Sequence, residues 1–368
     1  MKIYLIYNQF FDDYGKERKI GGVETYMEAL CNLFSKKGEE SIICQFSKIP
    51  FKKDLGKYKV CGFVAKTSSE LYKQLVKDIK KDDLIIFMNE VFALNVNQCK
   101  TINIQHGNYW DNPYTKGNIF IKFLRRIVII LRALVYYNRC KYHVAVDYNW
   151  YNWYKVFILN RLPKNLFVIP NFANQIISDE ELSNKLKTIQ EPIKIIFARR
   201  FINYRGSLLF AKTAAKLLSK YSNLQITLAG EGPCKQEMET ILAPYAKNVK
   251  FIKYLPNDSF SIHKQHDIAV VPTISCEGTS LSLLEAMAAG CLAVATPIGG
   301  MSNIILDGFN GFFAMPDEDS LYTVIGKAIQ QVYNKEIQKN AVLSIRKSFS
   351  LSKWENSWWD FITFVRNN

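Results

Sequence analysis

Two glutamates eight residues apart are the strongest chemical signal in this sequence. Glu277 and Glu285 enclose a run of small residues, which leads into an apolar helical pattern from about Leu281 to Ala289. A buried strand is predicted directly before them at Ile268–Pro272, so the segment reads as a strand-to-helix turn. The free N–H groups and the positive dipole at the start of such a helix suit an anion such as a diphosphate.

Each glutamate has its own predicted chemistry at this turn. Glu277 precedes the turn and can reach a neutral, hydroxylated group beside the phosphates. Glu285 lies one helical turn further and can accept two hydrogen bonds from vicinal hydroxyls such as those of a ribose. The simpler alternative is a capping segment followed by an ordinary exposed glutamate. The residues predicted to bring their backbone to the anion are Gly278, Thr279, Ser280 and Leu281.

Two arginines follow another predicted strand, Ile193–Ala198. They fall at the carboxyl edge of a parallel sheet, which is where α/β proteins bind ligands. Guanidinium groups bind phosphate oxygens through bidentate, charge-assisted hydrogen bonds. We therefore predict that Arg200 and Arg205 bind a diphosphate; two surface arginines without a ligand are the alternative.

Two features of the first half of the chain could face the same ligand. Gly21 and Gly22 follow the first predicted strand, Lys2–Tyr7, and would let the backbone approach a diphosphate closely. His106 ends the predicted strand Lys100–Gln105, at the same kind of edge. Taken alone, a glycine pair is more often a plain turn and a single histidine is more often structural. The residues that could line an acceptor are Asn108, Tyr109, Trp110 and Asp111.

Short β-rich apolar runs alternate with helical patterns along the chain, which is typical of parallel α/β architecture. A length of 368 residues exceeds a single core, so we expect two domains, 1–172 and 193–353, joined by a polar connector at 173–192. The predicted strands are Lys2–Tyr7, Ser41–Gln45, Leu84–Met88, Lys100–Gln105, His143–Val146 and Leu166–Ile169, then Ile193–Ala198, Leu224–Ala229, Val249–Tyr254, Ile268–Pro272 and Leu292–Ala295.

The segment from Glu277 to Gly290 resembles the EX7E motif of the family-4 (GT4) retaining glycosyltransferases, which have the GT-B fold. Other segments resemble motifs of the same family and occur in the family's order. The similarity is dense over about 190–320 and sparse before it. These other segments are Gly21–Glu24, Arg200–Gly206, Ala229–Pro233, Ala295–Gly300 and Asp307–Gly311.

The resemblance implies an α/β protein of the GT-B class, with two Rossmann-like domains whose parallel sheets face each other across an interdomain cleft. Residues 1–172 would bind the acceptor, residues 193–353 would bind the sugar nucleotide, and a C-terminal helix at 354–368 would pack back on the first domain. The reaction implied is transfer of a sugar with retention by same-face attack, with no metal and no cofactor.

The resemblance also implies roles for the residues above. Arg200 and Arg205 would stabilise the departing nucleotide diphosphate, Glu277 would bind the sugar hydroxyls, and His106 would contact the sugar from the first domain. These four residues are the expected catalytic set. Glu285 would bind the ribose. The expected nucleotide-binding set is Gly21, Gly22, Arg200, Arg205, Gly278, Thr279, Ser280, Leu281 and Glu285.

Three positions depart from the family pattern. Arg199 stands where the family usually has glycine, which leaves open whether Arg199 or Arg200 binds phosphate. Phe172 replaces the glycine of a Pro-Asn-Gly segment, and Thr279-Ser280 replace a frequent Phe-Gly pair. Because these changes alter the sugar pocket, the sugar is left open and the nucleotide is expected to be UDP or GDP.

The net charge of +15 is concentrated in the first half, with +12 in residues 1–175 and +3 in residues 176–368. Such a bias calls for an anionic partner. The predicted helix Ile119–Tyr137 is apolar over most of its circumference yet carries four basic residues. It is either a core-covering helix or a helix that lies in an anionic membrane surface. The basic residues are Lys122, Arg125, Arg126 and Arg132.

The acceptor suggested by these features is a lipid-linked or lipopolysaccharide glycan, and the expected location is cytoplasmic, peripheral on the inner face of the cytoplasmic membrane. The eight cysteines include no CxxC pair and read as buried thiols rather than as a zinc site or a disulfide framework. Three alternatives remain open: a nucleotide-sugar epimerase of the same fold, a sugar-binding protein without catalysis, and a basic nucleic-acid-binding protein, for which no recognised motif is found.

Overall fold

The computed structural model describes residues 1–19, 21–107, 117–157 and 165–368. Contacts between residues divide the chain into two compact units. Unit 1 comprises Met1–His106, Lys116–Ile169 and Glu355–Asn368, and unit 2 comprises Gly107–Thr115 and Pro170–Trp354. The predicted acceptor-lining residues Asn108 to Asp111 lie outside the described residues.

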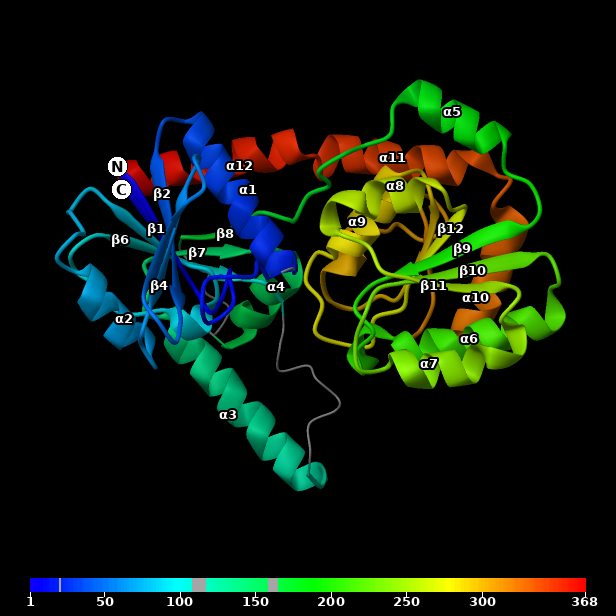
Figure 1. Cartoon of the computed structure of the whole chain (residues 1–368), viewed down its shortest axis with the longest axis horizontal. Coiled ribbons are helices and arrows are strands. Elements are labelled where there is room, and N and C mark those ends of the chain that lie inside the picture. The colour runs from blue at the N-terminus through cyan, green and yellow to red at the C-terminus, as the bar shows by residue number, and fades with distance from the viewer. Residues whose placement is uncertain (20, 108–116, 158–164) are drawn as a thin grey trace. The chain divides into compact units, whose positions relative to one another are not determined.

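Unit 1 contains a sheet of strand order β3-β4-β2-β1-β5-β6-β7-β8 (Figure 1). Every pairing is parallel except that of β3 with β4. The six strands predicted in this half are confirmed, whereas β3 and β4 were not predicted. The strands are β1 (Lys2–Tyr7), β2 (Glu40–Phe46), β3 (Phe51–Asp54), β4 (Lys59–Phe63), β5 (Leu84–Phe87), β6 (Lys100–Gln105), β7 (Tyr142–Ala145) and β8 (Leu166–Val168).

The C-terminal helix α12 (Leu351–Asn367) packs on unit 1 from Glu355 onward. Trp358 is fully buried and donates a 2.8 Å hydrogen bond from Nε1 to the Tyr26 hydroxyl, and the Phe361 ring lies 4.7 Å from that of Phe167. The Lys100 ammonium donates to two carbonyls in the last turn of α12. The other helices of this unit are α1 (Gly22–Lys36), α2 (Ser68–Leu75), α3 (Ile119–Tyr137) and α4 (Tyr148–Phe157).

Unit 2 contains an all-parallel sheet of strand order β11-β10-β9-β12-β13-β14. The five strands predicted here are confirmed; β14, of two residues, was not predicted. The strands are β9 (Ile193–Ala198), β10 (Leu224–Ala229), β11 (Val249–Ile252), β12 (Ile268–Val271), β13 (Leu292–Ala295) and β14 (Phe312–Phe313), and the helices are α5 (Asp179–Lys187), α6 (Ser207–Lys220), α7 (Lys235–Leu242), α8 (Ser259–Lys264), α9 (Leu281–Ala288), α10 (Glu318–Gln331) and α11 (Lys335–Ser348).

The strand order of unit 2 reverses between its two central strands. From β9 the chain proceeds outward through β10 and β11, and from β12 it proceeds in the opposite direction through β13 and β14. The loops that follow β9 and β12 therefore diverge at their carboxyl ends and open a crevice between them, the position at which open α/β sheets bind ligands. The stretch 173–192, predicted as a connector, lies in unit 2 and contains α5, whose capping residue Ser178 forms a full capping box with Glu181.

Candidate active site

A buried ion cluster occupies the switch point of unit 2. Oε2 of Glu277 accepts from Arg199 Nη2 at 2.5 Å, from Thr273 Oγ1 at 3.0 Å and from Arg205 Nη1. Arg199 also donates to Thr273 through Nη1. The Glu277 and Arg199 residues are only 8% and 7% exposed, so the cluster is largely withdrawn from water. A charge that is buried to this extent is tolerated because it is paired.

The two central strands supply the members of the cluster. Arg199 is the first residue after β9, while Thr273 and Glu277 follow β12. Arg205 ends a 3₁₀ turn that is closed by Gly206 at φ +80°, where an added Cβ would lie 1.9 Å from the Pro272 carbonyl oxygen. Only glycine fits a left-handed conformation pressed against another backbone. Gly206 therefore lets the loop after β9 approach the end of β12, which brings Arg205 within reach of Glu277.

The cluster is ionised and carries a net positive charge. Burial alone would raise the pKa of Glu277, but the neighbouring guanidinium groups of Arg205 and Arg199 lower it to about 2. One carboxylate between two guanidinium groups leaves about one unit of positive charge at the switch point. This charge, in a water-poor site, favours an anion.

The structure separates the two arginines between which the sequence could not choose. Arg199 is buried on Glu277, whereas Arg200 is exposed. Consecutive residues leaving a strand point in opposite directions, so only one of the pair can face the loop of β12. The cluster therefore joins Arg205 to Arg199 rather than to Arg200, and a phosphate contact of Arg200 stays a prediction.

The turn before α9 is shaped by two glycines from another loop. An added Cβ on Gly299, which has φ +55°, would lie 1.8 Å from the Glu277 carbonyl oxygen, and one on Gly300 would lie 2.6 Å from the Thr279 amide nitrogen. The backbone of 299–300 is thus packed directly on that of 277–279. This explains why the Ala295–Gly300 segment belongs with the Glu277 turn, although the two are distant in sequence.

The start of α9 has the features of an anion site. Ser280 is its N-cap residue but makes no capping hydrogen bond with its side chain. The Ser280 hydroxyl is buried and, within the described part of the chain, has no hydrogen-bond partner. The amides of the first helical turn therefore retain donor capacity that a capping side chain would otherwise satisfy. Gly278, Thr279 and Leu281 lie in the same turn, as the sequence predicted.

Glu285 lies in a separate environment one turn along α9. Its Oε2 accepts a 2.7 Å hydrogen bond from Ser259 Oγ at the start of α8. Burial raises the pKa of Glu285 to about 7, and the Ser259 bond offsets this only in part. Burial raises the pKa of the Tyr254 phenol, and the charge of the nearby Glu285 raises it further. Glu285 is thus close to half-ionised at neutral pH.

The predicted residues of the N-terminal half lie in unit 1. The His106 ring meets the Tyr26 ring edge to face, with centroids 5.1 Å apart. Burial lowers the pKa of His106 to about 4, so the imidazole is neutral at pH 7. Its Nε2 atom has no hydrogen-bond partner within the described residues. Gly21 is the N-cap residue of α1 and Gly22 its first residue, so this helix also begins without a side-chain cap.

Three residues of the site were not singled out from the sequence. Thr273 bridges Arg199 and Glu277, while Ser259 and Tyr254 surround Glu285. Thr273 directly follows the predicted strand Ile268–Pro272, which was the available signal for it. Ser259 and Tyr254 precede Glu285 by a strand and a helix, and only tertiary packing brings them together. Within the described residues, no group of three His, Cys, Asp or Glu side chains is arranged to hold a metal ion.

The site falls inside a family match. Residues 178–344 match the model of the family described as glycosyl transferases group 1. Lipopolysaccharide 1,2-N-acetylglucosaminetransferase from Salmonella typhimurium is 26% identical over 55% of this chain, and Protein CapJ from Staphylococcus aureus is 24% identical over 78% of it. The alignments cover 57% and 72% of the lengths of these two relatives.

Solved structures share the fold over the whole chain. Sucrose-phosphate synthase from Thermosynechococcus elongatus superposes with a TM-score of 0.75 at 14% identity, covering 99% of this chain and 98% of that one. HepE from Anabaena in complex with UDP superposes with a TM-score of 0.71 at 15% identity, covering 99% and 100%. Residues 178–344 therefore match the glycosyl transferases group 1 family, and the chain has the GT-B fold of these solved structures.

Proposed function

We propose that this chain is a glycosyltransferase that moves a sugar, with retention, from a UDP- or GDP-sugar to a membrane-associated glycan acceptor, in the synthesis of a bacterial polysaccharide, O-antigen or lipopolysaccharide. The observation that carries the proposal is the net-positive cluster of Glu277, Arg199 and Arg205 at the switch point of unit 2. It stands in the same loops as the start of α9, where the N-cap side chain of Ser280 makes no capping hydrogen bond within the described residues, so cationic groups and helix amides can face one anion.

The donor would be held by chemistry that matches each of its parts. Arg205 and the first amides of α9 would bind the diphosphate, Glu285 would accept from the ribose hydroxyls, and Glu277 would accept from the sugar. Within the described part of the chain, the three side-chain hydrogen bonds that Glu277 receives fall on Oε2, so Oε1 would serve the sugar. The UDP complex of the HepE relative supports a uridine nucleotide.

Catalysis would be mainly electrostatic. Guanidinium and amide groups fixed before the reaction stabilise the charge that grows on the leaving phosphate, without reorganising at the moment of reaction. His106 is neutral and has an unpartnered Nε2 in the described residues, so it would act through hydrogen bonding at the sugar rather than as a cation. The neutral imidazole would not compete with Arg205 for the phosphate. No metal or cofactor enters this proposal.

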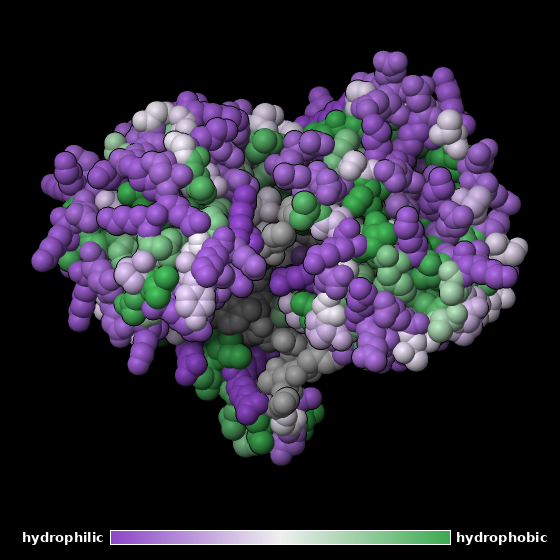
Figure 2. Space-filling model, viewed as in Figure 1, coloured by the Kyte–Doolittle hydropathy of each residue, from purple (hydrophilic) through white to green (hydrophobic). Residues whose placement is uncertain are grey.

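The membrane part of the proposal rests on α3. This helix extends away from the sheet of unit 1 and exposes large apolar side chains along its length, including Phe120 at 65%, Phe123 at 61% and Leu131 at 56% (Figures 1 and 2). In the described residues, none of the helices is long and apolar enough to cross a bilayer. An exposed apolar stripe on a monomer commonly marks a surface for a partner or a membrane.

Helical geometry places the charges of α3 opposite its apolar stripe. At about 100° per residue, Phe123, Ile127 and Leu131 fall on one side and the basic side chains fall on the other. The first turn of the helix holds no acidic residue. Apolar side chains would enter the acyl boundary, and each basic residue would add roughly 1 kcal/mol at an anionic surface. The basic residues are Lys122, Arg125, Arg126 and Arg132.

A panel of sugar nucleotides tests which donor the protein binds. Thermal shift with UDP- and GDP-sugars identifies the nucleotide, since a ligand that binds the folded state raises the melting temperature. Glycan acceptors are then added and transfer is followed by mass spectrometry. We expect one sugar nucleotide to stabilise the protein and to be consumed only with acceptor. Consumption without acceptor would instead indicate an epimerase, and absence of any stabilising sugar nucleotide would refute the proposal.

Vesicle flotation tests whether α3 binds the protein to an anionic membrane surface. We expect binding to vesicles of phosphatidylglycerol and phosphatidylcholine, weak binding to phosphatidylcholine alone, and loss of binding when all four basic residues of α3 are changed to Glu. A matched control changes Lys57, Lys73, Lys77 and Lys81, which are exposed residues of unit 1 outside α3, to Glu. If both quadruple variants lose binding equally, net charge and not α3 accounts for the attraction.

A further inference from the structure

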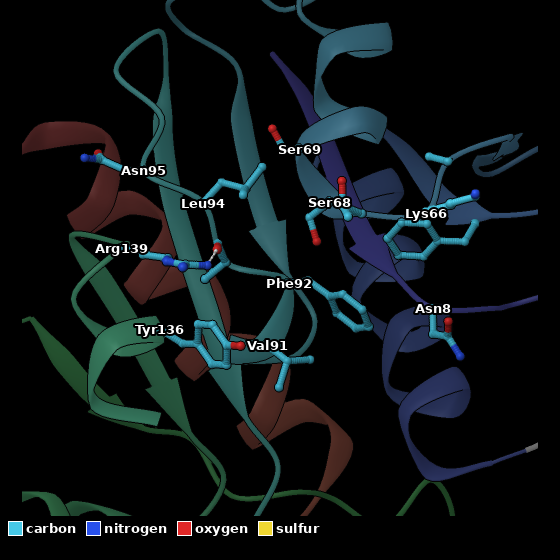
Figure 3. A pocket seen from close by; sticks show the side chains of 14 residues that line it. Asn8, Lys66, Ser68, Ser69, Val91, Phe92, Leu94, Asn95, Tyr136 and Arg139 are labelled. Atoms are coloured by element: carbon cyan, nitrogen blue, oxygen red, sulfur yellow. Dashed lines mark hydrogen bonds between the residues drawn. The ribbon is translucent and has the colours of Figure 1, made fainter. Parts of the chain in front are cut away.

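Unit 1 contains a pocket of about 770 Å³ that the proposed donor site does not use (Figure 3). It lies beside the carboxyl ends of four parallel strands: the last residue of β2 and residues that follow β1, β4 and β5 contribute to its lining. The last turn of α3 and the residues after it close one side. A volume of this size suits a small organic ligand such as a mono- or disaccharide.

Aromatic rings form the apolar part of the lining. The Phe46 and Phe92 rings are 5.8 Å apart and tilted by 42°, and Tyr136 of α3 adds a third ring. Figure 3 shows Phe92 near the centre of the view, with Ser68 close to it and Asn95 further out. Aromatic faces next to hydroxyl and amide groups are the combination that binds a sugar ring, which has apolar C–H faces and a hydroxyl rim.

The charged part of the lining is entirely cationic. Lys66 and Arg139 line the pocket on opposite sides, and no Asp or Glu is among the described residues that line it. Arg139 is held in place by a 3.1 Å hydrogen bond from Nη1 to the Ala93 carbonyl and by its position 4.8 Å from the Tyr136 ring centroid. Two fixed contacts orient the guanidinium, and its other N–H groups remain able to bind an anion.

We propose that this pocket binds a phosphorylated sugar, with the sugar ring on the aromatic side chains and the phosphate on Arg139. This inference rests on the proposed function, in which the ligand of the pocket is the phosphate-bearing sugar of the acceptor. Lys66, on the other side, adds to the positive field.

The position of Arg139 relates the pocket to the membrane helix. Tyr136, which lines the pocket, directly follows Val135, an apolar residue of α3 that is 56% exposed. Leu131 lies about 7–8 Å further along the helix axis, at about 1.5 Å per residue. A lipid attached through the phosphate at Arg139 would therefore leave the pocket next to the exposed apolar side chains of α3. A sugar joined to lipid through phosphate fits both surfaces at once.

Binding of three probes to the full-length protein tests the proposal. Glucose 1-phosphate carries both groups, methyl α-glucoside carries only the sugar, and inorganic phosphate carries only the anion. Calorimetry is done with saturating UDP, so that the nucleotide site is filled. We expect glucose 1-phosphate to bind at least about tenfold more tightly than either other probe, because charge-assisted hydrogen bonds add to the sugar contacts. Equal binding of phosphate alone would overturn the sugar assignment.

Variants assign the binding to the pocket. Arg139→Gln is expected to weaken glucose 1-phosphate binding about tenfold or more, and Arg139→Lys, which keeps the charge, should retain part of it. Lys66 is exposed, so Lys66→Gln should leave the fold intact; it should weaken glucose 1-phosphate binding less than Arg139→Gln does. The matched control is Lys57→Gln. Unchanged binding in Arg139→Gln would overturn the proposal.

The same experiments separate this inference from the proposed function. If no sugar nucleotide binds while glucose 1-phosphate binds through Arg139, the function fails and the pocket stands. If the wild-type enzyme transfers sugar and Arg139→Gln leaves the KM for acceptor unchanged, the pocket assignment fails and the function stands. We expect instead that Arg139→Gln raises the KM for acceptor about tenfold and leaves the KM for sugar nucleotide unchanged.

Discussion

The ionisation of Glu285 makes the affinity for a sugar nucleotide depend on pH near neutrality. Burial raises the pKa of this carboxyl to about 7 in the free protein. If the carboxylate accepts two hydrogen bonds from ribose hydroxyls, only the ionised form binds well, because a protonated carboxyl offers one fewer acceptor and no charge. Affinity is therefore expected to fall as the pH falls through about 7.

The size of the effect follows from the competent fraction of the protein. With a pKa of about 7, the ionised fraction of Glu285 is about 0.9 at pH 8 and about 0.1 at pH 6, and the apparent dissociation constant scales with the inverse of that fraction. We expect about tenfold weaker binding at pH 6 than at pH 8. The sign is opposite to that of a histidine that must be protonated to bind phosphate.

The histidines do not interfere in this range. Burial lowers the pKa of His106, His263 and His266 to about 4 and that of His143 to about 3, and these are the four histidines of the chain. All are neutral between pH 6 and 8.

Calorimetric titration with the sugar nucleotide found in the panel, at constant ionic strength, measures the pH dependence. Glu285→Gln serves as control and should bind weakly with a flat pH profile. A profile as steep in Glu285→Gln as in the wild type, or a flat wild-type profile, would refute the reasoning.

Three further outcomes are expected. Glu285→Gln should raise the free energy of unfolding of the ligand-free protein at pH 8 by about 2 kcal/mol, measured by urea unfolding. Because the folded state raises the pKa of this carboxyl, the wild-type protein loses stability as the pH rises from about 4.5 to 7. Each pKa unit is worth about 1.4 kcal/mol, and the partial exposure of Glu285 reduces the total. Arg205→Gln should lower kcat about 10²–10³-fold by removing one stabiliser of the leaving diphosphate, with Lys57→Gln unchanged. Gly299→Ala should lower the free energy of unfolding by at least about 2 kcal/mol, because the added Cβ would meet the Glu277 carbonyl. Gly308→Ala, at a similar φ but with open space around it, should lower it by about 1 kcal/mol; thermal melts measure both.

The strands with the clearest signal in the sequence are those buried on both faces. Leu84–Phe87 and Leu292–Ala295 are buried at every residue, so their apolar runs stand out against the helical periods around them. Two of the three strands that were missed, β3 and β14, are short and lie at sheet edges, and the third, β4, is the neighbour of β3. Phe51–Asp54 alternates partly buried with exposed residues and holds two lysines, and β14 has two residues. Edge strands lack the continuous apolar signal because solvent covers one side of them.

The same limit applies to the site. The turn from Glu277 to Glu285 was visible because its glycines, its glutamates and its helix follow one another in the chain. Which of Arg199 and Arg200 joins the buried cluster depends instead on the direction in which the chain leaves β9, and Arg199 joins it through hydrogen bonds to Thr273 and Glu277. Ser259, which sets the environment of Glu285, comes from another helix. Tertiary contacts of this kind leave no pattern in the local amino-acid sequence.

The cluster at the switch point combines a structural role with a chemical one, and this determines which substitutions are informative. The Arg199 side chain is 5% exposed, and removing Glu277 would leave it buried beside a second like charge, a change that typically costs about 3–5 kcal/mol of stability. Lost activity in a Glu277 variant would therefore not distinguish a missing sugar contact from a disordered loop. The Arg205 side chain is 20% exposed and pairs with the same carboxylate from the more open side, so its removal leaves Glu277 still paired with Arg199 and Thr273. Arg205 is thus the member of the cluster whose substitution reports on the diphosphate rather than on the fold.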